Sequence, residues 1–213
     1  MGTRVLPRLL VVYCVFGLVA CSRLLVGNYS TQLKAIEPGT YMLDPAHASV
    51  IFRVDHLGLS QYVGRFNKFE ASLDYDVEGG QSARLQAVVD TGSIDVNNAG
   101  FEKTLAGGGW LDSGEYPQAI LLVDAAPQIS SEGLVYNASF TLRGVTRDVP
   151  LLVQFNGGAQ NRLTGRYTLG FAAKAAITRA DFGITRFAGL VGNEVEIEIH
   201  AEFQRVASTA AAP

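Results

Sequence analysis

Apolar and polar side chains alternate along most of the chain beyond residue 40. In residues 134–142, "LVYNASFTL", every second residue from Leu134 onward is apolar, and the residues between them are mostly polar. The same period of two runs through 168–177, "TLGFAAKAAI", and through 195–203, "VEIEIHAEF". A period of two places alternate side chains on opposite faces of a strand, so these segments predict half-buried antiparallel strands.

Weaker copies of this alternation predict further strands, and turn signals such as "EGG", "SSEG" and "NGGAQN" separate them. These strands are expected at 41–44, 49–57, 62–76, 83–94, 119–125 and 149–155. Only residues 97–105, "NNAGFEKTL", have a helical character, with asparagines available as the N-cap. About eight antiparallel strands with one short helix predict an all-β, closed up-and-down barrel that can hold one small ligand. A two-sheet sandwich is the alternative, and the period alone does not separate the two.

The first twenty residues have the pattern of a bacterial lipoprotein signal peptide. Arg4 and Arg8 precede the uncharged apolar run 9–20, which is too short to span a bilayer as a helix. The run ends in "LVAC", which resembles a lipobox, so we expect cleavage after residue 20 and attachment of lipid, palmitate included, at Cys21. An ordinary secretory signal with a coincidental cysteine is the alternative.

This interpretation divides the chain into a signal peptide at 1–20, a tether at 21–39, a barrel at 40–205 and a disordered tail at 206–213. Ser22 after the cysteine favours the outer membrane, so we expect a protein anchored on the periplasmic side of the bacterial envelope. Cys14 would leave with the signal peptide and Cys21 would be lipidated, which leaves no thiol for a disulfide, a nucleophile or a metal.

The segment 88–95, "VVDTGSID", matches the catalytic loop of an aspartic protease. Such an enzyme needs two Asp residues that share a proton, and this chain has no second Asp-Thr/Ser-Gly sequence. Because Leu85, Ala87 and Val89 continue an alternation through Thr91, we expect a strand end with a local Gly bulge. Asp90 is therefore predicted not to be catalytic.

The three histidines are spread along the chain and predict no metal site and no catalytic group. His47 lies close to Asp44, and an Asp–His hydrogen bond that closes a turn is the simple interpretation. His200 lies among glutamates on the polar face of the last strand. His56 shares a strand face with Phe52 and Val54, where it is either a buried polar group or a ligand contact.

Two arginines follow long apolar strands, where the mouth of a barrel is expected. Arg143 in "TLRGVTRDV" and Arg179 in "ITRADFGI" could each bind a phosphate or another polar head group. A surface ion pair, such as Arg179 with Asp181, is the alternative. The net charge is −3 and no basic stripe with interleaved aromatic residues is present, so no nucleic-acid partner is expected.

Several segments together resemble the YceI-like family of bacterial envelope proteins, also described as lipocalin-like or polyisoprenoid-binding. They are "YMLDPAHASVIFRVDHLGLSQYVGRFNKFEASLDYD", "VVDTGSIDV", "YPQAILLV", "FTLRGVTRDVPLLVQF", "ITRADFGI" and "VGNEVEIEI", in that order. The resemblance covers about residues 40–203, and it explains Asp90 and Ser93 as part of a family strand pattern. The segment 101–117, "FEKTLAGGGWLDSGEYP", departs from the family pattern, so a loop at the cavity mouth around Glu102 to Trp110 is expected to differ.

The resemblance implies an eight-stranded antiparallel lipocalin-like barrel that binds or carries a long lipid, such as an isoprenoid quinone, a polyprenyl compound or a fatty amide, without catalysis or a cofactor. The predicted ligand contacts are Phe52, Val54, His56, Phe140, Leu142, Phe171, Ala173, Arg143 and Arg179. A barrel with a collapsed core, acting through protein contacts in a structural or stress-response role, is the alternative. The sequence leaves the oligomeric state open, a homodimer included.

Overall fold

The computed structural model describes residues 29–75 and 83–206 of the chain. The predicted signal peptide, the lipidation site Cys21, the first part of the tether and residues 207–213 of the predicted tail lie outside the described residues. No helix among the residues described is long and apolar enough to cross a membrane.

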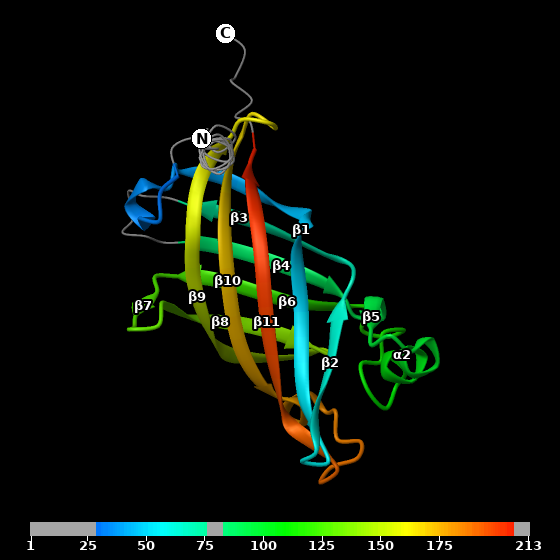
Figure 1. Ribbon diagram of the computed structural model, residues 1–213. Coiled ribbons are helices and arrows are strands. Elements are labelled where there is room, and N and C mark those ends of the chain that lie inside the picture. The colour runs from blue at the N-terminus through cyan, green and yellow to red at the C-terminus, as the bar shows by residue number, and fades with distance from the viewer. Residues whose placement is uncertain (1–28, 76–82, 207–213) are drawn as a thin grey trace, which may run out of the picture.

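The described chain is built almost entirely from antiparallel strands (Figure 1). The strands are β1 (Gly39–His56), β2 (Ser60–Phe66), β3 (Phe69–Tyr75), β4 (Ala83–Asp90), β5 (Ile94–Asp95), β6 (Gln118–Ala125), β7 (Gln128–Ile129), β8 (Leu134–Leu142), β9 (Val145–Asn161), β10 (Arg166–Thr178) and β11 (Val191–Arg205). The helices are α2 (Ala99–Ala106) and the short 3-10 turns η1 (Leu33–Ala35), η2 (Thr91–Ser93) and η3 (Arg179–Phe182).

Eight of these strands close into a barrel. The order is β1-β3-β4-β6-β8-β9-β10-β11, and β11 returns to pair with β1 along most of its length, from Tyr41↔Arg205 to His56↔Val191. The remaining strands are short additions: β2 and β5 extend the edge of β1, and β7 pairs with β8. Closure confirms the predicted eight-stranded antiparallel barrel and excludes the two-sheet sandwich, because a sandwich would leave β1 and β11 unpaired.

The strand β1 unites two strands that the sequence predicted separately, at 41–44 and 49–57. Its pairing with β11 is interrupted between Leu43 and Ala48, where four residues of β1 lie opposite Glu202 alone. This interruption is a bulge, which hides the continuity of the strand from the alternation pattern. The long β1 serves two partners on its other edge, β3 near Gly39 and β2 from Val50 onward. The predicted strand 62–76 is therefore split into β2 and β3.

One glycine-containing segment differs from the prediction. The sequence "NGGAQN" lies inside β9 instead of forming a turn, and the turn comes later, where Gly165 N–H donates to Asn161 O at 2.8 Å. Gly157 has a φ of +144°, and a Cβ there would lie only 2.4 Å from the ring of Tyr29. The absence of a side chain at Gly157 thus lets Tyr29 approach the strand closely, which is one recognised role of glycine within strands.

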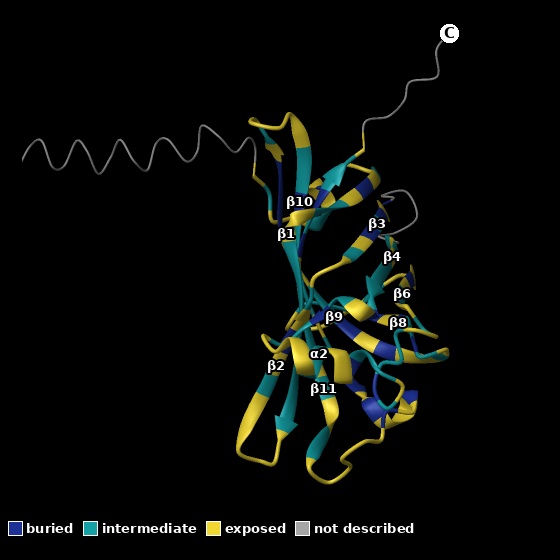
Figure 2. Ribbon diagram, turned by 90° about the vertical axis from the view of Figure 1, so that its right-hand side faces the viewer, coloured by how far each residue is buried: buried dark blue, intermediate teal, exposed yellow. Residues whose placement is uncertain are grey.

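The helix α2 forms where the sequence predicts one. Its N-cap is Asn98, whose side chain accepts from Phe101 N–H at 3.1 Å. Glu102 reaches back to accept from the N–H groups of Val96 and Asn98, both at 3.1 Å. The helix lies beside the lower part of the barrel with an exposed outer face (Figure 2), while Leu105 is buried in the core. This helix, with the loop after it, covers one side of the barrel interior.

Candidate ligand-binding cavity

The interior of the barrel contains a cavity of about 630 Å³. It extends from Leu33 of η1 at one end to Leu57 of the β1–β2 hairpin at the other, so it follows the long axis of the barrel. Its walls are almost entirely aliphatic and aromatic side chains. Sites for small molecules typically have volumes of about 300–1,000 Å³ and mostly apolar walls, so this cavity has the size and chemistry of a binding site.

The alternation of the strands produces these apolar walls. Along β11, Val195, Ile197 and Ile199 face the cavity, whereas Glu198 points outward and pairs with Arg53 of β1. Along β10, the inward positions include the small Ala173 and Ala175. A strand that presents methyl groups instead of large side chains leaves space between the walls, and this accounts for part of the open volume.

Most of the residues predicted as ligand contacts lie on the cavity wall. They are Phe52, Val54 and His56 from β1, Phe140 from β8, Phe171 and Ala173 from β10, and Arg179 from η3. Phe171 is in ring contact with Phe155 and Phe203, and Phe140 contacts Phe182 edge-on. Their position makes contact with an enclosed molecule possible, and the contact itself stays a prediction.

Leu142 and Arg143 lie elsewhere, and neither belongs to the described residues that line the cavity. Leu142 is the last residue of β8 and is packed in the buried core. Arg143 follows with a φ of +50° and donates to the carbonyl oxygens of Gly183 and Gly108, at 3.2 and 3.3 Å. The structure thus places both residues off the cavity wall, because β8 ends here and two loops close over its end; that they contact a ligand stays a prediction.

Arg179 is almost fully buried, with 4% of its surface exposed. Its guanidinium donates to four backbone oxygens at 2.8–3.0 Å and lies 5.9 Å from the ring centre of Trp110. The four acceptors are those of Ile184, Arg186, Val191 and Gly192. Burial lowers the pKa of Arg179 from its ordinary value. Within the described part of the chain Arg179 forms no ion pair with Asp181, so the ion-pair alternative is wrong for Arg179, whose side chain instead organises the loop between η3 and β11. Arg143 does have an ion-pair partner, since its Nη2 lies 3.9 Å from Asp112 Oδ2.

Sequence reasoning missed several wall residues at the lower end of the cavity. Trp110 comes from the loop after α2, Phe187 and Leu190 come from the loop after η3, and Leu57 comes from the β1–β2 hairpin. Trp110, Phe187 and Leu190 belong to no period-two pattern, and Leu57 ends the predicted strand 49–57 on the face opposite Phe52 and Val54. The signal that could have found them is the presence of large apolar residues within loops, where polar residues are expected.

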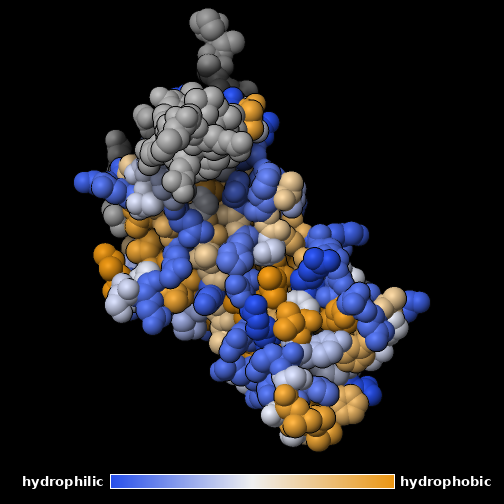
Figure 3. All heavy atoms as spheres, viewed as in Figure 1, coloured by the Kyte–Doolittle hydropathy of each residue, from blue (hydrophilic) through white to orange (hydrophobic). Residues whose placement is uncertain are grey.

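The side chains of Leu57, Phe187 and Leu190 line the cavity and are also exposed on the outside. Leu57 N–H donates to Leu190 O at 2.9 Å, which holds the hairpin and the loop side by side. Figure 3 shows hydrophobic side chains gathered at this lower end of the molecule. The cavity therefore meets the surface here, and its rim is apolar.

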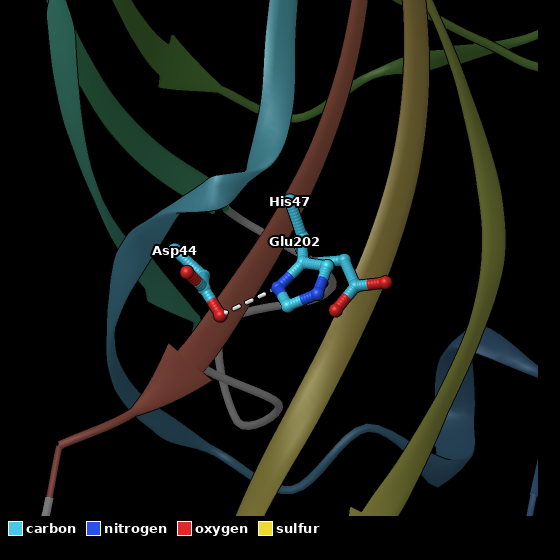
Figure 4. Close-up of side chains that lie close together, drawn as sticks. All are labelled: Asp44, His47 and Glu202. Carbon is cyan, nitrogen blue, oxygen red and sulfur yellow. Dashed lines mark hydrogen bonds and ion pairs between the residues drawn. The ribbon is translucent and has the colours of Figure 1, made fainter.

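Within the described residues, one group of side chains could hold a metal ion: Asp44, His47 and Glu202, whose ligand atoms lie within 4.8 Å of one another (Figure 4). The β1 bulge brings Asp44 and His47 over Glu202 of β11. His47 Nδ1 lies 3.0 Å from Asp44 Oδ2, which confirms the predicted hydrogen bond. This bond raises the pKa of His47 and lowers that of Asp44. His47 is largely exposed, and a solvated Asp–His pair accounts for the contact without an ion.

Asp90 has a structural role at the turn that follows β4. The strand β4 ends at Asp90 instead of continuing to Ile94, and η2 follows it. The Asp90 carboxylate accepts from Gly92 N–H at 2.9 Å and so caps this turn. Thr91 is fully buried and its hydroxyl donates to Tyr116 O at 2.8 Å. The predicted Gly bulge is thus a 3-10 turn, in which each of these side chains has a local hydrogen-bonding role.

Comparison with known proteins finds similar sequences and folds. A family model described as the YceI-like domain matches residues 41–203. The UPF0312 protein of Shewanella oneidensis is 32% identical over 180 residues, which cover 84% of this chain and 94% of that protein. The crystal structure of Burkholderia cenocepacia BcnA has a TM-score of 0.63 at 24% identity and covers 75% of this chain and 98% of BcnA. A polyisoprenoid binding domain from Saccharophagus degradans, implicated in plant cell wall breakdown, has a TM-score of 0.55 at 14% identity, covering 80% of this chain and 100% of that domain.

Proposed function

The chain belongs to the family of YceI-like domain proteins, and from this premise we propose that its barrel binds one long apolar lipid in the cavity without catalysing a reaction. The single observation that carries the proposal is the cavity of about 630 Å³ with aliphatic and aromatic walls. Such walls offer few hydrogen-bonding groups, so they suit a hydrocarbon chain better than a polar substrate.

The energetics of this binding are favourable. Each methylene removed from water is worth about 0.8 kcal/mol, so ten enclosed methylenes contribute roughly 8 kcal/mol before the costs of association. An elongated cavity suits an extended chain that contacts the wall along its length. The ligand classes that fit are isoprenoid quinones, polyprenyl compounds and fatty amides. The Saccharophagus degradans domain, named as polyisoprenoid binding, supports the isoprenoid classes through its similar fold.

We further propose that the protein works at the bacterial envelope as a lipoprotein. The support is the sequence alone: the charged start, the short apolar run and "LVAC" before Ser22. Cys21 would carry the lipid anchor, and the barrel would lie on the periplasmic side of the outer membrane.

Native mass spectrometry of the protein, purified without detergent and followed by organic extraction, tests the lipid proposal. We expect a discrete added mass that extraction removes and identifies as a long-chain lipid. The alternative is a barrel that acts through protein contacts alone. It predicts no added mass in the purified protein and no uptake of an added isoprenoid quinone into the barrel. Finding neither an endogenous lipid nor uptake of the added quinone would refute the proposed function.

A further inference from the structure

Four large apolar side chains are exposed at the lower end of the barrel, and we call them the apolar tip. They are Leu57 and Leu59 of the β1–β2 hairpin and Phe187 and Leu190 of the loop before β11, with exposed fractions of 49%, 84%, 54% and 54%. The tip lies at the end of the molecule opposite the β9–β10 turn (Figures 1 and 3). Exposed apolar residues are common singly, but several together mark a site of interaction.

The backbone holds the apolar tip in an unfavourable conformation. Leu57 and Gly58 have φ values of +60° and +68°, and Leu59 N–H donates to His56 O at 3.1 Å, which closes a β-turn with Leu57 and Gly58 at its centre. Such turns favour Asn or Asp before the glycine, because a leucine strains the backbone at positive φ. Phe187 also has a positive φ, of +53°. Two of the four tip residues are therefore bulky side chains at strained positions, as is common where a segment has a function.

The apolar tip is continuous with the cavity. Leu57, Phe187 and Leu190 line the cavity from within while remaining exposed outside, whereas Leu59 faces only outward and does not belong to the described lining residues. A lipid that left the cavity past these three apolar side chains would meet few polar groups of the wall, with His56 beside Leu57 among them. It would meet water immediately beyond them unless another apolar phase covered the tip.

We propose that the apolar tip inserts into the surface of a lipid bilayer and forms the portal through which a lipid enters the cavity. The inference rests on the proposed lipid-binding function and names the partner of that same cavity. A bilayer is the occupant that gives the lipid a water-free path between the membrane interior and the barrel. A second copy of the chain would also cover the tip, but it would close the portal to the membrane.

A fluorophore next to the tip tests the docking. The full chain carries Cys14→Ser and Cys21→Ser, and Ser60→Cys places an environment-sensitive dye at an exposed position beside Leu59. Phosphatidylcholine vesicles are added in excess. Free vesicles then remain available to the tip even when the N-terminal segment has bound another vesicle. We expect a blue shift of the dye. Leu59→Ser should weaken this response about ten- to hundredfold, because burial of one leucine contributes that much to a partition constant.

Ile129→Ser is the matched control, because Ile129 is 82% exposed and lies on β7, away from the tip (Figure 1). It should leave the response of the dye at position 60 unchanged. An absent blue shift, or an equal loss with Leu59→Ser and Ile129→Ser, would overturn the docking inference. So would a blue shift without vesicles that grows with protein concentration, because that result assigns the tip to contacts between copies of the chain.

Lipid occupancy of the same variants separates this inference from the proposed function. Leu59 does not line the cavity. Native mass spectrometry should therefore find the same bound lipid, in the same amount, in the Leu59→Ser variant and in the protein with the unaltered tip. Bound lipid without a vesicle response would refute docking and leave the lipid-binding function standing. A vesicle response without lipid in any variant would refute the lipid-binding function and leave the tip as a membrane contact.

Discussion

Enlarging one alanine in each of two barrel strands, β10 and β8, should distinguish an open cavity from a packed core. Ala173 on β10 lines the cavity, whereas Ala138 on β8 is fully buried and is not among the described lining residues. Both alanines contact the same cluster of Val123, Tyr136 and Leu151. The substitutions Ala173→Phe and Ala138→Phe therefore add the same ring to similar surroundings, and they differ in whether space is available.

The expected magnitudes follow from the volumes. An engineered cavity of about 150 Å³ in another protein accommodates benzene, so one added ring would occupy roughly a quarter of the cavity here. Ala173→Phe should change the free energy of unfolding of the lipid-free protein by less than about 1 kcal/mol, because the ring gains apolar contacts without displacing neighbours. Ala138→Phe overpacks the core and should cost about 1–3 kcal/mol or more, which corresponds to a melting temperature roughly 2–12 °C lower.

Thermal unfolding followed by circular dichroism, together with native mass spectrometry of each variant, provides the two readouts. Ala173→Phe should also reduce the amount of bound lipid, since the ring occupies part of the lipid's space. If both substitutions lowered the melting temperature by the same large amount and neither variant nor the unaltered protein bound lipid, the interior would be a packed core and the reasoning from the cavity would be refuted.

Three further predictions concern single groups. The hydrogen bond to Asp44 raises the pKa of His47. The protonated pair should therefore stabilise the fold at pH values below the ordinary His pKa, and this stabilisation should be lost as the pH rises through the raised pKa. In an NMR titration, Asp44→Asn should return the pKa of His47 toward 6.5. Asp44 has a lowered pKa, so its own contribution is lost only as the pH falls through that value. Arg179→Lys and Arg179→Met should both lower the free energy of unfolding in urea by roughly 2–4 kcal/mol, because neither can donate to four carbonyl oxygens; unchanged stability of the Lys variant would show that charge alone suffices. Cys21→Ser should abolish labelling with palmitate and release the protein from membranes, and a variant that stays labelled would contradict the lipobox interpretation.

The alternation pattern located the strands because each barrel strand has one apolar and one solvated face. The predicted strand 134–142 coincides with β8, and 195–203 lies within β11. The pattern failed where the backbone leaves the regular ladder. At the bulge opposite Glu202, four residues of β1 have no regular partner, so one long strand was predicted as two. At Asp90, the apparent alternation continued by chance into a 3-10 turn.

The candidate site was predictable where it lies on strands and unpredictable where loops meet. Phe52, Phe140 and Phe171 were found because strand periodicity alone decides which way they face. Arg143 and Arg179 could not be placed in this way. Their positions depend on the loops after α2 and η3, whose carbonyl oxygens bind both guanidinium groups. The apolar tip was missed for the same reason, since its four residues come together only when the hairpin and the loop before β11 lie side by side.

The size of the cavity also bears on what fills it. In a well-studied lysozyme, each Å³ of empty core volume costs about 24 cal/mol, so a dry void of this size would cost roughly 15 kcal/mol, which equals or exceeds the whole stability of a typical domain. An enclosed dry void of this size would therefore be strongly destabilising, so a molecule that filled the barrel would stabilise it. Water is a poor filling, because an ordered water needs two to four polar partners and the walls supply few of them. A hydrocarbon chain needs none, and it restores the contacts between apolar groups that the small Ala173 and Ala175 leave unmade. Under the proposed function, the same small side chains that would make an empty barrel costly leave the space that a long lipid would fill.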